Sequence, residues 1–180
     1  GLEGAGEILE VGAGVEGLAV GDRVMATLRH GAFAEQAVAD AAEVFAIPDG
    51  LNFAEAAAVP VAYGTSHVAL TRRANLQPGE TLLVLGAAGG VGLTAVEIGK
   101  ALGATVIAAA SGADKLALAQ SHGADHLIDY TKDDMRAAVR DITGGRGADV
   151  IYDPVGGEAF KTALRCIAWE GRLLVIGFAS

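Results

Sequence analysis

The 180-residue sequence contains a single cysteine, Cys166. One cysteine cannot form an internal disulfide, and no pair of cysteines is present to hold a structural zinc ion. We therefore expect a reducing, cytoplasmic environment. The histidines are scattered along the chain, at His30, His67, His122 and His126. Because tetrahedral zinc needs three or four convergent ligands, we predict no metal site.

Positive charge is scarce as well. The sequence has 13 Lys and Arg against 22 Asp and Glu, which gives a formal net charge of -9. This balance is unfavourable for binding to nucleic acid or to an anionic membrane surface. Long apolar runs are also missing, since Leu82–Leu85 is far below the roughly 20 residues that a membrane helix needs. An anionic ligand would therefore require a local cationic pocket.

The first 50 residues have a short, strand-like pattern. Runs such as Glu7–Val11 and Arg23–Ala26 are separated by glycine-rich turns, which is typical of an all-β unit. At Asn52 the pattern changes, because a Glu three residues later forms a capping-box signature for a helix. We expect Pro60 to end that helix, and a second helix to run over residues 61–73 and stop at Asn75.

After residue 80 the chain alternates strands with helices. The expected strands are short apolar runs at residues 81–86, 105–110, 126–130, 149–153 and 172–177. The helices between them are amphipathic; the last apolar stripe runs from Phe160 to Ile167. This alternation predicts an α/β fold with a doubly wound parallel sheet, in which ligands bind beyond the carboxyl ends of the strands. A complete dinucleotide-binding domain usually has six strands, and five are visible here.

A glycine-rich segment connects the first of these strands to the first helix. Ala87, Gly89 and Gly92 occupy the three small-residue positions of the dinucleotide fingerprint. Small residues let the backbone approach a pyrophosphate, and the following helix offers free N–H groups and its positive dipole end. The alternative is a tight turn that merely tolerates glycine. The candidate cofactor-binding residues here are Gly86, Ala87, Ala88, Gly89, Gly90, Val91 and Gly92.

The end of the second strand bears on which dinucleotide is bound. NAD sites usually carry an acidic residue there for the ribose 2′-hydroxyl, but this strand ends in Ala108–Ser111. Ser111 can donate to a phosphate oxygen, and Lys115 can supply a cation, so the pattern favours NADPH. The missing acid also argues against methyl transfer from S-adenosylmethionine. Alternatively, Ser111 with Asp114 is an ordinary helix cap and Lys115 an ordinary surface residue.

Several motifs in combination resemble those of one enzyme family. They are Gly1–Gly6, Gly21–Val24, Ala62–Thr65, Gly86–Gly92, Gly123–His126 and Asp153–Gly157. Together they resemble the zinc-independent quinone oxidoreductase (zeta-crystallin-like) branch of the medium-chain dehydrogenase/reductases. Zinc-dependent members of the superfamily have a His in a Gly-His-Glu triplet, whereas Leu2 stands at that position here.

The resemblance implies a two-domain protein. Residues 1–60 would be part of a GroES-like catalytic domain, and residues 61–180 a Rossmann NADP-binding domain without its last strand. NADPH would bind between them, and the full-length protein would be a homodimer. Gly1 stands where an initiator Met is expected, and the resemblance implies that the start of the catalytic domain and the last Rossmann strand are missing, so we expect the chain to be truncated at both ends.

The resemblance also assigns residues along the cofactor. Gly89, Gly90 and Val91 would contact the pyrophosphate, and Ser111, Lys115 and Tyr130 would hold the 2′-phosphate. Thr65, Val155 and the segment of Gly177, Phe178 and Ala179 would line the nicotinamide. The structural alternatives are a half-buried aromatic at a strand end for Tyr130, a helix residue bonded to its own backbone for Thr65, and a core residue for Phe178.

The implied reaction is hydride transfer from NADPH to a quinone or another conjugated carbonyl. Tyr63 or Thr65 is a candidate donor to the developing oxyanion, and the proton could come from solvent. One alternative is an enoyl-thioester reductase with the same chemistry. The other is a non-catalytic, crystallin-like NADPH-binding protein, since the same cofactor residues would serve it equally well.

Overall fold

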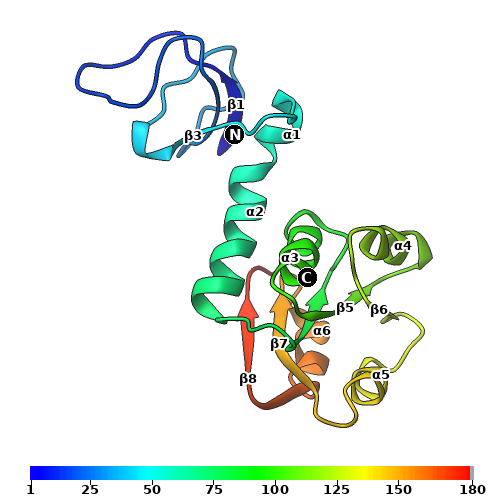
Figure 1. The fold of residues 1–180 in the computed structure, drawn as a ribbon. Helices are drawn as coiled ribbons and strands as arrows, with labels where there is room; N and C mark the ends of the chain where they lie inside the picture. Colours follow the sequence, from blue (N-terminus) through cyan, green and yellow to red (C-terminus); the bar gives the residue numbers. More distant parts are fainter. Residues whose placement is uncertain (179–180) are drawn as a thin grey trace. The chain divides into compact units, whose positions relative to one another are not determined.

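The computed structural model describes residues 1–178. The chain divides into two compact units, Gly1–Gly64 and a second unit that begins at Thr65 (Figure 1). The boundary expected from the sequence lay at residue 60.

The first unit contains a small antiparallel sheet in the order β1-β2-β3. Its strands are β1 (Glu3–Glu7), β2 (Arg23–Thr27) and β3 (Val44–Ala46), the last preceded by the short helix η1 (Ala41–Glu43). The expectation of a strand over residues 7–11 was wrong. β1 pairs residue for residue with β2, from Glu3 opposite Thr27 to Glu7 opposite Arg23, and the chain turns away after Ile8 accepts a bond from Gly21 N–H.

The helix start at Asn52 has the expected capping box. Asn52 Oδ1 accepts from the Glu55 N–H at 3.0 Å, and Glu55 Oε2 accepts from the Asn52 N–H at 2.9 Å. However, α1 (Phe53–Ala57) ends before Pro60, which lies in the first turn of α2 (Val59–His67). Proline is tolerated there because the first N–H groups of a helix have no intrahelical acceptor. The chain continues as the wider helix η2 (Val68–Arg73) and stops at Asn75, which is left-handed with φ 48°.

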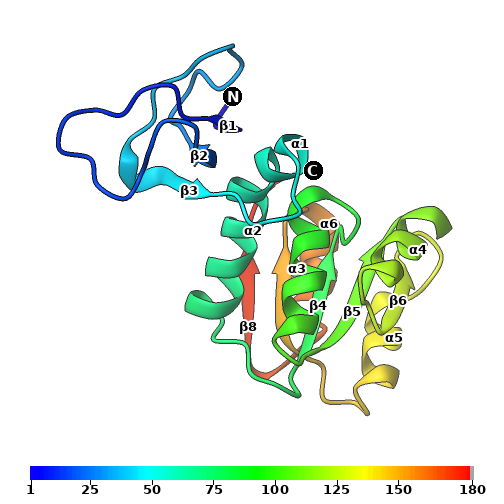
Figure 2. The same ribbon diagram turned by 45° about the horizontal axis from the view of Figure 1, so that its top comes forward.

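The second unit is a five-stranded parallel sheet in the order β6-β5-β4-β7-β8 (Figure 2). This confirms the doubly wound α/β class. The strands are β4 (Thr81–Leu85), β5 (Thr105–Ala110), β6 (His126–Asp129), β7 (Ala148–Asp153) and β8 (Ile167–Val175). The helices between them are α3 (Gly90–Ala101), α4 (Ala113–Ser121), α5 (Met135–Ile142) and α6 (Gly157–Ala163).

The two faces of this sheet bury separate apolar clusters. On β4, Leu82 and Val84 pack into the cluster that includes α3, and Leu83 and Leu85 into the cluster that includes α5 and α6. All four are fully buried, as expected when helices cover both faces of a parallel sheet. Burying each such side chain contributes about 1.5–3 kcal/mol. The glycine-rich turn after Leu85 therefore starts from a firmly held strand.

The predicted boundaries of the last helix and the last strand were wrong, because the strand expected at residues 172–177 is β8 (Ile167–Val175). We placed Ile167 on the stripe of the last helix, but α6 ends at Ala163 and Ile167 begins β8. Cys166 is buried at the turn between them, and its carbonyl accepts the Ala148 N–H at 2.8 Å. This bond ties the turn to the start of β7, so the chain is already extended at Ile167.

Candidate functional site

The turn between β4 and α3 depends on the lack of side chains at Gly86 and Gly92. Gly86 has a left-handed φ of 58°, which glycine adopts without strain. A β-carbon at Gly92 would overlap the Gly86 carbonyl group, so α3 can start this close to the strand only with glycine there. The Gly89 N–H closes the turn by donating to the Gly86 oxygen at 2.9 Å.

The first turn of α3 provides a group of backbone donors. The helix begins at Gly90, and its first closing bond runs from Leu93 N–H to the Gly89 oxygen at 2.8 Å. The N–H groups of Gly90, Val91 and Gly92 therefore have no acceptor within the helix, and they lie at the positive end of its dipole. Such a turn can bind a phosphate group.

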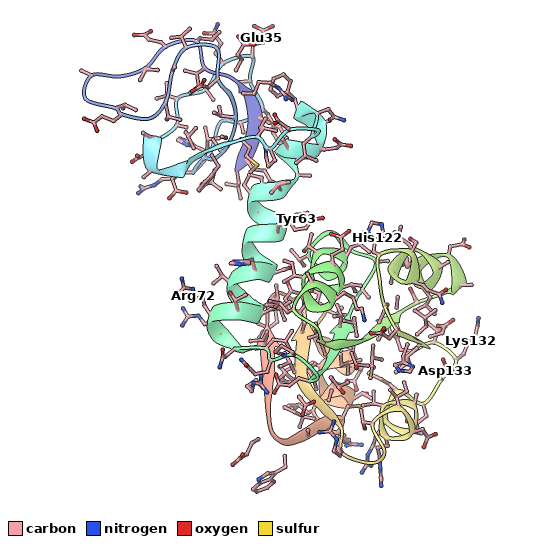
Figure 3. The ribbon with its side chains drawn as sticks, in the orientation of Figure 1. Glu35, Tyr63, Arg72, His122, Lys132 and Asp133 are labelled. Carbon is pink, nitrogen blue, oxygen red and sulfur yellow. The ribbon has the colours of Figure 1, made fainter. Side chains whose placement is uncertain are left out.

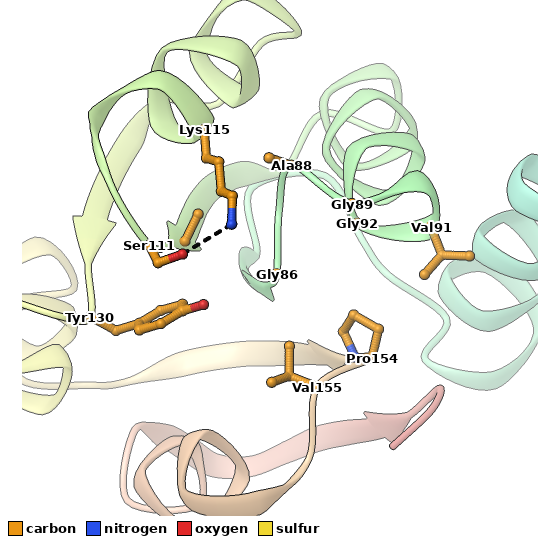
Figure 4. A pocket seen from close by; sticks show the side chains of 11 residues that line it. Gly86, Ala88, Gly89, Val91, Gly92, Ser111, Lys115, Tyr130, Pro154 and Val155 are labelled. Carbon is orange, nitrogen blue, oxygen red and sulfur yellow. Dashed lines mark hydrogen bonds between the residues drawn. The ribbon is translucent and has the colours of Figure 1, made fainter. Parts of the chain in front are cut away.

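A cavity of about 410 Å³ lies beside this turn, at the carboxyl ends of β4 to β7 (Figure 4). The reversal in strand order, between β4 and β7, falls at the same place. Nine of the candidate cofactor-binding residues line the cavity: Gly86, Ala88, Gly89, Val91, Gly92, Ser111, Lys115, Tyr130 and Val155. These residues come from the connections that follow β4, β5 and β6 and from the segment after β7. The cavity therefore forms only when the sheet brings these segments together.

Two further lining residues were missed, Ala110 and Pro154. Ala110 ends β5 and Pro154 follows the last residue of β7. The usable signal was their position, because ligands bind at the carboxyl ends of the strands near the reversal.

Ser111 and Lys115 form one side of the cavity. Lys115 Nζ donates to Ser111 Oγ at 3.1 Å (Figure 4). The N-cap of α4 is Gly112, which has φ 86° and no side chain, so Ser111 is not the helix cap that the alternative interpretation required. Both residues line the cavity.

The buried carboxylate of Asp129 connects the loops that carry Ser111 and Tyr130. Its Oδ1 accepts the Thr131 hydroxyl at 2.6 Å and the Thr131 N–H at 3.1 Å, and its Oδ2 lies 3.2 Å from Lys132 Nζ. Hydrogen bonds from Thr131, Lys132 and the Gly112 N–H hold the pKa of Asp129 far below its ordinary value, against the opposing effect of burial. The ionised carboxylate thus fixes both loops.

The remaining candidates do not line this cavity. Ala87 is fully buried and its N–H donates to the Ala109 oxygen at 3.2 Å, so it belongs to the sheet edge. Gly90 is exposed beside the cavity. Thr65 and Gly177 are partly buried outside the lining, and Phe178 is 82% exposed and so is not a core residue. Ala179 lies outside the described residues.

Tyr63 lies in the middle of α2 and is 37% exposed (Figure 3). It belongs to the first unit, whereas Thr65 begins the second. The roles proposed for these two side chains stay predictions.

Among residues 1–178, no three His, Cys, Asp or Glu side chains are grouped as ligands for a metal ion. Over the same residues, every helix is too short or too polar to cross a bilayer.

Comparison with known proteins places the chain in a family. The zinc-binding dehydrogenase profile matches residues 90–180, and the alcohol dehydrogenase GroES-like domain profile matches residues 1–49. A quinone oxidoreductase-like protein 2 homolog of Nematostella vectensis is 42% identical over 181 residues, which cover 100% of this chain and 50% of that protein.

Solved structures support the same family assignment. A mycobacterial protein in complex with NADPH superposes with a TM-score of 0.92 at 36% identity, over 100% of this chain and 57% of that one. The CurK enoyl reductase gives a TM-score of 0.92 at 35% identity, over 98% of this chain and 53% of that one. This chain spans about half the length of the curated relatives it matches. It belongs to the zinc-binding dehydrogenase family of the medium-chain dehydrogenase/reductase superfamily, and it is similar to proteins named quinone oxidoreductases.

Proposed function

We propose that the protein is an NADPH-dependent oxidoreductase that transfers hydride to a quinone or another conjugated carbonyl without zinc. The observation that carries the proposal is the composition of the cavity. A phosphate-binding turn, a Ser–Lys pair and an aromatic residue surround one space at the reversal in strand order.

The residues around the cavity fit the adenosine half of the dinucleotide, which has the diphosphate at one end and the 2′-phosphate and adenosine at the other. The N–H groups of Gly90, Val91 and Gly92 would bind the diphosphate, because they lack intrahelical acceptors. Lys115 and Ser111 would donate to the 2′-phosphate, and Tyr130 would lie against the adenosine. The positive charge of Lys115 matters because the chain carries a net charge of -9, which is unfavourable for an anionic ligand.

The choice of NADPH over NADH follows from the end of β5. Ala110 stands where a carboxylate would accept the ribose 2′-hydroxyl of NADH and repel a 2′-phosphate. The nearby Asp129 is already bonded to Thr131 and Lys132, so its charge is partly compensated. The mycobacterial structural neighbour was solved with NADPH, which supports the same choice.

The bound cofactor supplies the hydride, while the protein orients the reactants and excludes water. We assign Thr65, Val155, Gly177, Phe178 and Ala179 to the nicotinamide end. We assign Tyr63 or Thr65 as the donor that stabilises the oxyanion forming on the acceptor. The proton that completes the reduction would come from solvent.

A direct assay tests this proposal. Purified protein is mixed with NADPH and 1,4-benzoquinone, and the nicotinamide absorbance is followed against a protein-free mixture. We expect enzyme-dependent loss of absorbance with NADPH and a much slower loss with NADH. Saturable NADPH binding without turnover would support a non-catalytic, cofactor-binding protein, and absence of binding would reject the cofactor assignment.

An enoyl-thioester reductase is the second candidate, because the CurK enoyl reductase has the same fold over 98% of this chain. Crotonyl thioester replaces the quinone in the same assay. A higher kcat/KM for the thioester would favour this candidate, and a higher value for the quinone would reject it.

The proposal includes three features of the whole protein. These are a homodimer, a cytoplasmic location, and a catalytic GroES-like domain ending near residue 60 before a nucleotide-binding domain. The GroES-like profile match over residues 1–49 supports the domain, and the single cysteine in the sequence supports the cytoplasmic location. The homodimer rests on the family resemblance alone.

A further inference from the structure

Three buried hydroxyl groups meet beneath the first turn of α3. Ser66 Oγ lies 2.8 Å from Thr94 Oγ1, 2.8 Å from Tyr152 Oη and 2.9 Å from the Val91 carbonyl oxygen. Ser66 and Tyr152 are fully buried, and Thr94 is 6% exposed. The three side chains come from α2, α3 and β7, so the cluster joins α3 and β7 to the part of α2 that lies in the second unit.

The direction of these hydrogen bonds follows from the available protons. The Val91 carbonyl can only accept, so Ser66 donates its one proton to it. Ser66 Oγ then has lone pairs left to accept the Tyr152 hydroxyl. Burial raises the pKa of Tyr152, which keeps this hydroxyl protonated as a donor. Thr94 has one proton, which it can donate to Ser66 Oγ at 2.8 Å or to the Val91 oxygen at 3.1 Å.

The first turn of α3 needs an anchor of this kind. Gly89, Gly90 and Gly92 have no side chains, which leaves the turn open to a ligand but deprives it of packing contacts. Of the residues between 89 and 92, Val91 alone has a side chain, and its carbonyl is the group that the hydroxyls hold. A buried hydroxyl is costly unless it is hydrogen-bonded. If the cluster only held the helix against the sheet, apolar side chains would do so equally well.

We propose that Tyr152 and Ser66 are positioning residues for the coenzyme: through the Val91 carbonyl they fix the orientation of the N–H groups that bind the diphosphate. This inference rests on the proposed function, because it takes the ligand of α3 to be a dinucleotide. Neither residue touches the ligand cavity itself, whose lining includes Val91 but neither hydroxyl.

The test compares ligands with and without a diphosphate. The dissociation constants of NADPH, NADH and 2′-AMP are measured by calorimetry for the wild type, Tyr152→Phe and Ser66→Ala, well below each variant's unfolding temperature. We expect both variants to bind NADPH and NADH roughly three- to tenfold more weakly, by the same factor, the size of one net hydrogen bond. Binding of 2′-AMP, which lacks the diphosphate, should be unchanged.

Thr143→Val is the matched control. Thr143 Oγ1 also bonds a helix carbonyl, that of Val139 at 2.7 Å, but it lies at the end of α5 before β7 begins. Its variant should bind all three ligands like the wild type. Unchanged NADPH binding in both hydroxyl variants, or an equal loss for 2′-AMP, would overturn the inference. A wild type that binds none of the ligands would instead reject the proposed function and, with it, this inference.

Discussion

Lys115 Nζ donates to Ser111 Oγ across 3.1 Å, which brings a cation and a hydroxyl from two sides of a glycine N-cap into one wall of the cavity. The pair spans one helical turn, so its geometry is set by the start of α4. Both groups can donate a hydrogen bond to the same phosphate oxygen. The pair therefore makes a specific distinction between cofactors testable.

Lys115→Ala should weaken NADPH binding and leave NADH binding almost unchanged. Only NADPH carries the 2′-phosphate, and a charge-assisted hydrogen bond contributes about 1.5–3 kcal/mol, or roughly 10- to 150-fold in the dissociation constant. Titration of each coenzyme against the variant measures the effect. Lys161→Ala is the control, since Lys161 pairs with exposed Glu158 on α6. An equal loss for both coenzymes would show that Lys115 does not recognise the 2′-phosphate.

Gly90→Val should impair coenzyme binding alone, whereas Gly92→Val should impair stability as well. A β-carbon at Gly90 would meet nothing within 4 Å, so that variant should fold and unfold nearly like the wild type but lose affinity for NADPH and NADH alike. A β-carbon at Gly92 would overlap Gly86 backbone atoms, so that variant should lose stability as well. Thermal unfolding with coenzyme titration separates the two, and undiminished coenzyme binding by Gly90→Val would contradict the assigned role of the turn.

The glycine turn could be predicted because its requirements are local. A buried strand, small residues and a helix follow one another directly, and the steric reasons for Gly92 and the donors of the first turn come from neighbouring backbone atoms. The strands of the parallel sheet were predictable for a similar reason, as each contains a short, nearly continuous apolar run. Ile167 was misassigned because its conformation depends on the distant strand β7, through the bond from Ala148 to Cys166.

The hydroxyl cluster beneath α3 lay beyond sequence reasoning. Ser66 meets Thr94 across 28 residues and Tyr152 across 86, and no spacing rule relates them. The same holds for the anchoring role of Asp129, whose residue type alone would suit an exposed strand end. Position within the assembled sheet, rather than local pattern, gives these side chains their partners.

Substitutions of two helical glycines should have opposite effects on stability. A β-carbon at Gly99 would lie 2.5 Å from Leu82 Cδ2 and 3.2 Å from Val106 Cγ2, both in the core. Overpacking of about 1–3 kcal/mol should exceed the gain of up to about 1 kcal/mol in helix propensity, so Gly99→Ala should be less stable. Gly64→Ala on α2, where nothing lies within 4 Å, should be more stable. Chemical denaturation measures both, and a stabilised Gly99→Ala would show that the core can adjust.

Acid should destabilise the second unit partly through Glu80. The Arg172 guanidinium binds both carboxylate oxygens, at 2.8 and 2.7 Å, and these bonds lower the pKa of Glu80 despite its partial burial. A lowered pKa in the folded state means that the stabilisation is present above the unfolded pKa of about 4.3 and is lost as the pH falls through the folded value. Glu80→Gln should therefore be less stable at neutral pH and lose less further stability below about pH 4.

Urea unfolding from pH 7 to pH 3 measures this difference in stability, with exposed Glu158→Gln as the control. Parallel acid profiles for Glu80→Gln and the wild type would show that the Arg172 pair does not contribute to the acid dependence.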